Sequence, residues 1–497
     1  MAKNQKGKAK SARKKTAKSN TTVSRRGETV MKSNSNVMGY LPNDTPPTGQ
    51  MILLGFQHVL TMFPATAFVA ALCGFHVGTV LTLSGIGTIV ALLLAKMRIG
   101  KFIPLFYGSS FSYIAAYQTI ATLMTGAPPA FGTPLPDNVI STIQAGIVVT
   151  GLLNILIGFI IRAVGKERID MVLPPIVTGS VAAIIGFGLA FAALGLVAAN
   201  WGVGIVTLLA TILFSVYLQS RGFLGMIPVI LGAVVGYLFS AIVQPGSVNF
   251  APVAAAPLFA IPHFTFPAFS GAFVGTAIFS VAVMAIATIP ESTAHLYQIS
   301  LYVDRFAEDM GREKYNLDEN IGFNLVLDGV DDTMKGLFGA TAGTNYGENN
   351  SLMAITRNYS GPALIAAGVI AVLLGFVGKL AGLMQTVPLA VSGGLAIYLF
   401  GAIGMQGIAL MQEHKVSMFD PRNLAVGATI MVVGIGGNIG YPNGLLPIPF
   451  LQGVFPSGLP AIATAAVLGI LLNAIFLVFK PATADTEVVD EAMAAAD

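Results

Sequence analysis

The feature that most constrains this chain is its series of long apolar stretches. The hydrocarbon core of a bilayer is about 30 Å thick, and a helix of about 20 predominantly apolar residues crosses it. Hydrophobic residues make up 54% of the chain and charged residues only 10%, which leaves too little polar surface to cover a soluble globule. We therefore predict an all-α protein that crosses a membrane many times. The stretches that qualify as spans lie near residues 51–73, 76–95, 103–124, 139–161, 171–197, 201–219, 223–243, 270–303, 361–381, 386–411, 423–438 and 459–479.

The two ends of the chain are polar and differ in charge. Eleven of the 27 Lys and Arg residues lie between Lys3 and Lys32, a segment without the apolar core of a signal peptide. We predict that residues 1–48 form a solvated, disordered cytoplasmic tail. A sharper interpretation is that this tail is attracted to anionic lipid head groups, and we expect no nucleic-acid partner. Residues 481–497 are predicted to form a second, acidic tail. Cys73 is the only cysteine, which excludes a disulfide scaffold.

Residues 319–358 decide the number of spans. They contain several charged residues and a polar run, so hydropathy alone assigns them one poor span or none. Two spans here would bring the total to fourteen and put both termini on one side of the membrane. With that count, all 27 Lys and Arg except Lys335 and Lys379 fall in the cytoplasm, as the positive-inside rule requires. A twelve-span count keeps the same orientation. We predict a multi-pass protein of the plasma membrane with both termini cytoplasmic.

Two polar interruptions fall at matching positions in the fourteen-span count. The third span contains YGSSFSY at 107–113, and the tenth contains GTNYGENNS at 343–351. The second run is either an external loop or protected backbone inside the bundle, because unpaired backbone cannot face lipid. The tenth span lies seven spans after the third. Because seven is odd, the second half of the chain would cross the membrane in the opposite direction to the first, which predicts inverted repeats over residues 49–243 and 244–480. Interrupted spans in corresponding positions indicate a transporter with its substrate site near the membrane midplane.

Glu291 and His295 are the ionisable residues of the eighth span, 270–303. They are four residues apart and therefore share one face of a helix. The stretch is too long for one straight span, and Pro290 removes a backbone donor just before Glu291. The span either ends near Pro290, with Glu291 in an interfacial extension, or starts later and brings Glu291 into the bundle. Ionisable side chains inside a membrane are usually functional.

A metal site is the other interpretation of this pair. Glu291 and His295 could supply two ligands, but a catalytic zinc ion needs three protein ligands and the sequence has no His-Glu-x-x-His motif. We therefore predict no metal, no bound cofactor and no catalytic residues, and the protein is not expected to be an enzyme. His58 is expected to pack inside the first span, and the Asp residues within 328–332 are expected to end a span or to order the tenth-span break.

Several of these segments resemble the nucleobase–ascorbate transporter family, also called nucleobase:cation symporter-2, and within it the uracil permease branch. The resemblance extends over about residues 45–480. It is carried by GFQHVL at 55–60 with MF at 62–63, GSSF at 108–111, ESTAHL at 291–296, YGEN at 346–349 and AITR at 354–357.

The tenth-span motif is the most specific part of this resemblance. Glu348 resembles the uracil branch, whereas the xanthine and urate branches usually carry Gln at this position. Ser351 departs from the usual Gly, and Pro290 and Ser292 depart from the usual neighbours of Glu291.

The resemblance implies a fold of fourteen spans in two inverted repeats, with short strands in spans three and ten. Spans one to four and eight to eleven would form a core domain, and the other six spans a gate domain. It also implies that Glu291 and Glu348 bind a nucleobase, and that backbone N–H groups near Phe111 and Gly347 bind its carbonyl groups. His295 would orient Glu291 or help to couple protons.

Two further side chains complete the expected binding site. The resemblance implies that Ala65 packs on the substrate ring, and the residue chemistry suggests flat apolar contact from Phe111 and Tyr346. Uracil is planar and neutral, with two N–H donors and two carbonyl acceptors that suit carboxylates and free backbone N–H groups. Two carboxylates in a poorly hydrated pocket resist being ionised together, so we expect Glu291, His295 and Glu348 to take part in proton coupling.

The predicted function is that of a proton-coupled symporter that imports a nucleobase, with uracil as the favoured base. Two buried glutamates are predicted to bind this base. A xanthine, urate or other purine permease is the alternative within the family. An anion carrier of the same architecture is the alternative outside it, although the two glutamates disfavour an anion. The expected partners are the nucleobase, the proton as coupling ion and membrane lipid, and a homodimer is left open.

Overall fold

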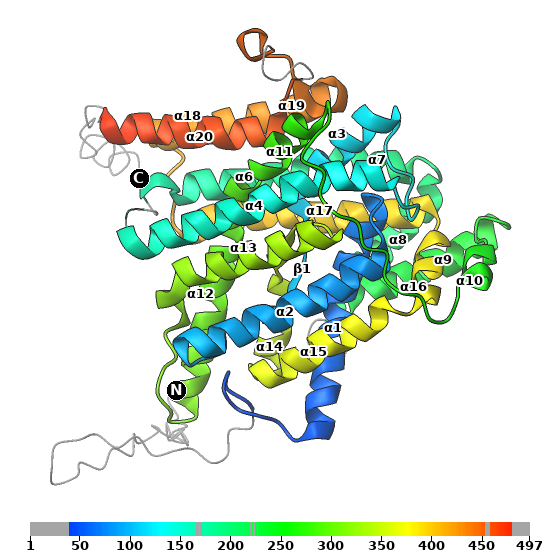
Figure 1. Ribbon diagram of the computed structural model, residues 1–497, viewed down its shortest axis with the longest axis horizontal. Helices are drawn as coiled ribbons and strands as arrows, with labels where there is room; N and C mark the ends of the chain where they lie inside the picture. Colours follow the sequence, from blue (N-terminus) through cyan, green and yellow to red (C-terminus); the bar gives the residue numbers. More distant parts are fainter. Residues whose placement is uncertain are drawn as a thin grey trace, which may run out of the picture.

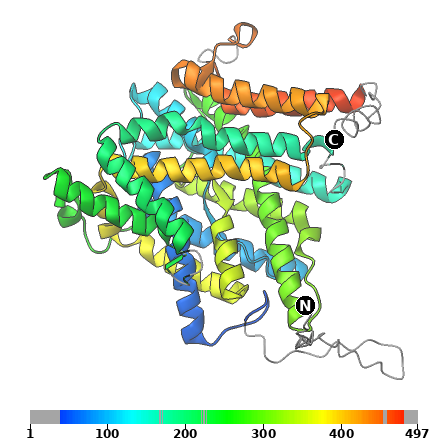
Figure 2. The same ribbon diagram turned by 180° about the vertical axis from the view of Figure 1, so that it is seen from behind.

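The computed structural model describes residues 39–479, apart from 166–167, 169–170, 219–220, 222–223, 226 and 453–457. The predicted acidic tail and most of the predicted basic tail lie outside the described residues. The described chain is mostly helical (Figures 1 and 2), which confirms the predicted helical architecture.

The helices pack into two groups by their mutual contacts. The first helix group contains α1 (Thr48–Leu72), α2 (Val77–Ile99), α3 (Ile114–Thr125), α4 (Asp137–Val164), α11 (Val274–Ala282), α12 (Ala285–Asp309), α13 (Ile321–Phe338), α14 (Gly347–Thr356), α15 (Gly361–Gly375) and α16 (Gly378–Gln385). The second helix group contains α6 (Pro175–Gly188), α7 (Ala190–Val197), α8 (Trp201–Tyr217), α9 (Pro228–Val243), α17 (Leu389–Glu413), α18 (Pro421–Met431), a π-helical turn (Val432–Gly436), α19 (Gly437–Gly440) and α20 (Ala461–Val478). The short helix α10 (Ala251–Ala255) contacts α16.

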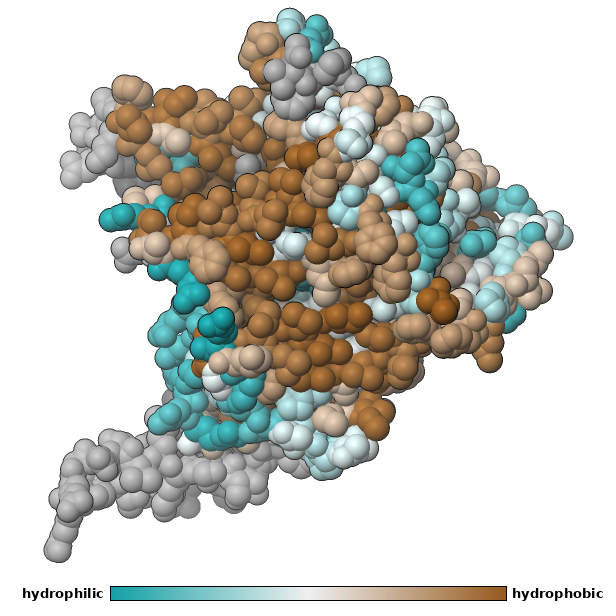
Figure 3. Space-filling model, in the orientation of Figure 1, coloured by the Kyte–Doolittle hydropathy of each residue, from teal (hydrophilic) through white to brown (hydrophobic). Residues whose placement is uncertain are grey.

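Apolar helices give the molecule a hydrophobic outer face. In the described chain, seven helical segments are long and apolar enough to cross a membrane, and α8, α9 and α15 are shorter apolar helices. Figure 3 shows a broad hydrophobic face with hydrophilic surface at two opposite edges. Large side chains such as Leu156, Phe159 and Leu373 are exposed on the outer surface, as expected where lipid replaces water.

The long eighth stretch is divided between two helices. α11 ends at Ala282 and α12 begins at Ala285, so the break precedes Pro290. Pro290 lies in the second turn of α12, and the helix continues to Asp309. The long stretch is thus not one straight helix, as its length predicts, and α12 carries both Glu291 and His295.

Pairs of glycines allow three pairs of helices to pack closely. α4 and α13 meet at Gly158 and Gly322, where a Cβ on Gly158 would lie 2.6 Å from the Gly322 carbonyl oxygen. α2 and α15 likewise meet at Gly78 and Gly375, and α6 and α17 meet at Gly179 and Gly407. Small residues let helix backbones approach closely in membranes, where lipid supplies no hydrophobic drive for association.

Two short strands cross inside the first helix group. β1 (Tyr107–Ser109) pairs antiparallel with β2 (Gly343–Asn345), and both strands are buried. The backbone pairing continues beyond the strands, because Tyr346 donates its N–H to Phe106 and Ser110 donates to Ala342, each at 3.0 Å. The interrupted backbone is thus hydrogen-bonded within the protein. Two further short strands, β3 (Leu445–Leu446) and β4 (Leu459–Pro460), pair in the second helix group.

Polar side chains of α13 hold the strand crossing from behind. Lys335 is fully buried, its Nζ lies 2.7 Å from Asp331 Oδ2, and it donates to the Gly108 carbonyl oxygen at 3.1 Å. Asp332 accepts from the Gly343 N–H at 2.6 Å and from Asn154 at 3.1 Å. The assignment of Lys335 to the outer side is therefore corrected, because this lysine lies inside the protein and neutralises a buried carboxylate.

The start of the described chain packs against the first helix group. Leu41 is fully buried, Tyr40 donates its N–H to the Arg357 carbonyl oxygen, and Tyr359 donates to Tyr40. The predicted disordered tail is corrected over residues 39–47, because these backbone contacts join them to the junction of α14 and α15.

The buried ion pair makes Lys335→Met a test of the strand crossing. Removing one partner leaves Asp331 as an uncompensated buried charge, and we expect a loss of stability of about 3–5 kcal/mol. The measurement is the melting temperature of the purified protein in detergent. The matched control is Lys314→Met, because the Lys314–Glu308 pair at 2.8 Å is half exposed, and it should melt like the parent chain. Equal melting of both variants would contradict the anchoring role of Lys335.

Candidate functional site

A cavity of ≈ 250 Å³ lies between the two helix groups. The first group contributes residues from α1, from the 3₁₀ turn Phe111–Tyr113 and from α14, and the second contributes residues from α9 and α17. Pockets for drug-sized ligands usually measure about 300–1,000 Å³, so this cavity suits a smaller ligand. Its lining residues are Thr61, Pro64, Ala65, Phe111, Gly225, Ile227, Pro228, Val229, Glu348, Ser351, Leu352, Ile355, Tyr398, Leu399, Ala402, Ile403 and Gln406.

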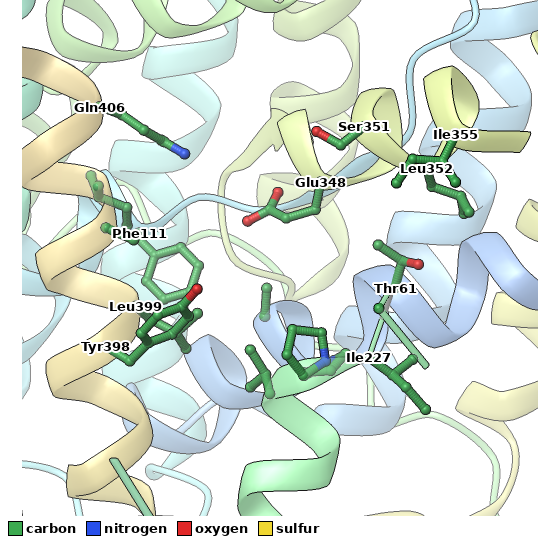
Figure 4. Close-up of a pocket in the computed structure, with 17 residues that line it drawn as sticks. Thr61, Phe111, Ile227, Glu348, Ser351, Leu352, Ile355, Tyr398, Leu399 and Gln406 are labelled. Atoms are coloured by element: carbon green, nitrogen blue, oxygen red, sulfur yellow. The ribbon is translucent and has the colours of Figure 1, made fainter. Parts of the chain in front are cut away.

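Glu348 is the only charged residue among the described residues that line this cavity. It stands in the first turn of α14, and its carboxylate points towards the space that Phe111 and Gln406 border (Figure 4). The expectation that both glutamates are buried is corrected, because Glu348 is exposed and Glu291 is partly exposed. A carboxylate that binds a ligand has to present its oxygens to open space.

The start of α14 also offers backbone donors. The first N–H groups of a helix have no partner within the helix, and no side chain caps this one. Gly347 is the first residue of α14 and is partly exposed. Gly347 is not itself a lining residue, so this helix start reaches the cavity through Glu348, whose carboxylate is a strong acceptor.

Glu291 lies close to this end of the cavity without lining it. Its carboxylate is hydrogen-bonded with Ser112, which follows Phe111 in the interrupted third segment. Glu348 and Asp328 are near enough to interact with Glu291 electrostatically. The two predicted carboxylates are thus neighbours, although only Glu348 borders the cavity.

A chain of polar side chains connects α12, α13 and β2 behind the cavity. Ser292 donates to the Asp328 carboxylate and accepts hydrogen bonds of 2.8 Å from Asn324 and Asn345. Asn345 also donates to Asp328 at 3.4 Å. Its side-chain oxygen is 2.8 Å from His295 Nδ1. The chain therefore runs from Asp328 through Ser292 and Asn345 to His295.

This arrangement fixes which nitrogen of His295 carries a proton. The Asn345 amide nitrogen donates to Ser292 and Asp328, so its oxygen has to accept from His295 Nδ1–H. In the neutral ring, His295 Nε2 then carries no proton and can accept a hydrogen bond. It faces Gly347, because a Cβ at that glycine would lie 2.7 Å from this nitrogen.

Tyr346 does not line the cavity, although its place in the tenth-span break predicts ring contact with a substrate. Its hydroxyl is hydrogen-bonded with Thr66 at 2.9 Å and donates to the Ser109 carbonyl oxygen at 2.9 Å. Its ring occupies the space in which a Cβ of Gly108 would lie. The ring therefore packs on the strand crossing and is 3% exposed.

Ala65 and Phe111 do line the cavity, and Phe111 also contacts the second helix group. Its ring lies 6.0 Å from the ring of Phe400 in α17, and Phe68 in α1 lies 6.2 Å from the same ring. His58 is buried and accepts a hydrogen bond of 3.1 Å at Nδ1 from Asn349, so it joins α1 to α14. This contact agrees with the packing role expected for His58.

Sequence reasoning missed the polar residues that the second helix group brings to the cavity. Tyr398 and Gln406 project from α17 on the side opposite Glu348 (Figure 4), and Tyr398 is hydrogen-bonded with Ser215. Gln406 is a polar residue in a long apolar span, which indicates that it has a polar partner or lines a cavity. The sequence does not indicate which helix it faces. Ser292 was noted as a departure from the family motif, but its link to Asp328 needs the fold.

The fold and the interface cavity define a membrane transporter. The sequence matches the Permease family (Xan_ur_permease) over residues 49–441. The chain belongs to this family of permeases and is not an enzyme.

Curated relatives match over most of their length. The uracil permease of Bacillus caldolyticus is 34% identical over 445 residues, which cover 87% of this chain and 93% of that protein. The uracil permease of Bacillus subtilis (strain 168) is 33% identical and covers 89% of this chain and 96% of its own length. The putative pyrimidine permease RutG of Escherichia coli (strain K12) is 31% identical, with 90% and 94% covered.

Solved structures show the same fold at low sequence identity. The transmembrane domain of a cyanobacterium bicarbonate transporter, BicA, has a TM-score of 0.55 and 15% identity, and covers 88% of this chain and 100% of that domain. The murine Solute Carrier 26 family member A9 anion transporter in the inward-facing state has a TM-score of 0.57 and 12% identity, with 88% and 69% covered. These likenesses support the transporter fold.

The Asn345 side chain joins three partners, so Asn345→Ala tests the polar chain behind the cavity. The change leaves the Ser292, Asp328 and His295 groups without this amide, and we expect a stability loss of about 1–3 kcal/mol for the unsatisfied buried groups. The measurement is the melting temperature in detergent. Asn138→Ala is the control, because Asn138 is exposed and should tolerate the change. An unchanged melting temperature of Asn345→Ala would show that the polar chain does not stabilise the site.

Proposed function

We propose that this permease is a proton-coupled nucleobase symporter and that uracil is the nucleobase it transports. The observation that carries the proposal is the cavity end where Glu348 lies beside the uncapped start of α14 and Phe111. The 33–34% identity with uracil permeases supports the choice of a pyrimidine base. Xanthine, urate and other purines are the alternative substrates.

The chemistry of this cavity end complements one edge of a nucleobase. A carboxylate accepts hydrogen bonds from ring N–H groups, and free backbone N–H groups of Gly347 and its neighbours donate to ring carbonyls. Phe111 and Ala65 offer apolar contact to the ring faces. A site of this kind rejects ligands without matching polar groups, because its own groups would be left unpaired.

We propose that the first helix group is the core domain and the second is the gate domain. The pairing of helices supports two inverted repeats of seven segments, residues 49–243 and 244–480, in a total of fourteen. α2 contacts α15 and α13 contacts α4, and these two contacts are equivalent under an offset of seven segments. α8 contacts α9 as α18 contacts α20, which is a second equivalent pair. The cavity lies between the two proposed domains, where their relative motion would alter access to it.

Proton coupling would use the carboxylates beside the cavity and His295. Glu291 has the carboxylates of Glu348 and Asp328 as neighbours, and like charges resist simultaneous ionisation, so the coupled proton would stay on Glu291 or enter with the substrate. Protonation would neutralise the loaded site and lower the cost of moving it past the gate domain. His295 has Nε2 towards Gly347 and Nδ1 fixed by Asn345. It would therefore link a change of charge at the cavity to the hydrogen-bonded side chains that end at Asp328.

The plasma membrane with both termini on the cytoplasmic side is the proposed location. With Lys335 inside the protein, Lys379 is the remaining lysine that this orientation assigns to the outer side. It is held at the surface by hydrogen bonds of 2.6 Å and 3.2 Å to the carbonyl oxygens of Val253 and Ala254.

An anion carrier is disfavoured by the lining of the cavity. The two structural neighbours above are named as a bicarbonate transporter and an anion transporter, but the only charge among the described lining residues is the carboxylate of Glu348. An anion site would need a cation or further donors in that position.

Glu348→Gln tests the proposed substrate contact. Loss of a charge-assisted hydrogen bond costs about 1.5–3 kcal/mol, which corresponds to about 10- to 100-fold weaker binding. The measurements are uracil binding to purified protein and uptake of labelled uracil in proteoliposomes, with xanthine, other bases and bicarbonate as competitors. Glu313→Gln, at an exposed position, is the control and should bind like the parent chain. Parental affinity in Glu348→Gln would refute the contact, and preferential competition by xanthine would change the substrate.

Glu291→Gln tests proton coupling separately from binding. We expect uptake by the parent chain to rise when the interior of the proteoliposome is made alkaline, and we expect this dependence to be lost in Glu291→Gln because the amide cannot be protonated. The measurement compares accumulation with and without an imposed proton gradient. Full accumulation by Glu291→Gln, together with indifference of the parent chain to the gradient, would rule out proton symport.

A further inference from the structure

Three segments of the first helix group bring two imidazoles and a carboxylate together at one end of the molecule. His76 is the residue before α2, Asp137 is the first residue of α4, and His263 lies in the connection before α11. One ligand atom from each of these residues lies within 4.8 Å of the other two. Among the described residues, this is the group with the composition of a metal site.

The supporting contacts indicate a built arrangement. His263 Nε2 lies 3.0 Å and 3.1 Å from the two Asp137 carboxylate oxygens, and the centroids of the His76 and His263 rings are 4.4 Å apart. Thr79 holds the His263 segment through a hydrogen bond of 2.7 Å to the His263 carbonyl oxygen. Metal-ligating side chains depend on such fixation of the segments that carry them.

His76 supplies the observation that points to a ligand. Its Nε2 atom is buried and has no hydrogen-bond partner. A buried polar atom without a partner is costly, and in native proteins it calls for an explanation such as an ion. Neutral imidazole nitrogen is a preferred ligand of zinc, and carboxylate oxygen is another.

We propose that His76, Asp137 and His263 form a zinc site, with water as the fourth ligand. Zinc bound by three protein ligands at about 2.0–2.2 Å keeps one open tetrahedral position. Asp137 and His263 are 62% and 50% exposed, so they can rotate around an ion, which would replace the proton that they now share. In the orientation proposed above, the site faces the exterior.

The site would hold the outer ends of α2 and α4 to the segment before α11. All three belong to the first helix group, so zinc would stabilise this group without bridging to the second. Substrate binding uses other residues, and the proposal is therefore independent of the transported solute.

The test uses the full chain, purified through a tag that contains no histidine. After exposure to zinc chloride and desalting, we expect one zinc per chain by elemental mass spectrometry, and a higher melting temperature with zinc than with chelator. His76→Gln, His263→Gln and Asp137→Asn should each weaken binding by at least about 100-fold, more than the loss of a mere supporting partner. His414→Ala, which removes an exposed histidine elsewhere, should bind like the parent chain.

Two further measurements keep the result interpretable. Melting in chelator should be the same for the variants and the parent chain, which separates loss of the site from loss of the fold. Cobalt(II) should give the visible absorption of a tetrahedral site in the parent chain and not in His76→Gln. Absence of bound zinc, or equal zinc binding by His76→Gln and the parent chain, would overturn the proposal.

Discussion

Two helices are interrupted inside the membrane, and their exposed backbone groups have to find partners within the protein. Lipid offers none, and each unsatisfied group would cost several kcal/mol. The chain meets this constraint by pairing β1 with β2 and by surrounding the pair with polar side chains of the first helix group. Lys335, Asp332 and Tyr346 each bind a backbone group of this crossing. This pairing positions α3 and α14, which follow β1 and β2 in the chain, and α13, which supplies Lys335 and Asp332.

The same interruptions produce the candidate site. A helix that begins in the middle of the bundle presents free N–H groups there, and α14 begins with Gly347 and Glu348. The polar chain from Asp328 to His295 reaches the back of this helix start and joins it to α13. The opposite wall comes from α9 and α17 of the second helix group. The cavity therefore depends on the relative position of the two groups.

Much of this could be predicted from the sequence, because membrane insertion is governed by local composition. The length of the apolar stretches predicts the helices, and the two polar runs predict where helices are interrupted. Glu348, Phe111 and Ala65 were expected near a ligand, and all three line the cavity. Lys335 was misassigned, because hydropathy treats every lysine as a surface charge and does not see the carboxylate that neutralises it. Tyr346 was expected to face a ligand, but an aromatic residue in a break can equally pack on the break itself.

The sequence by itself determined that this protein lies in a membrane and where its helices are interrupted, since both depend on residues that are neighbours in the chain. Only the tertiary structure decided which helices pair, that Tyr398 and Gln406 face Glu348, and that the two histidines meet Asp137. These contacts join residues that are distant in the chain. They follow from close packing at glycines such as Gly158 and Gly322 and from hydrogen-bond partners that no local pattern specifies.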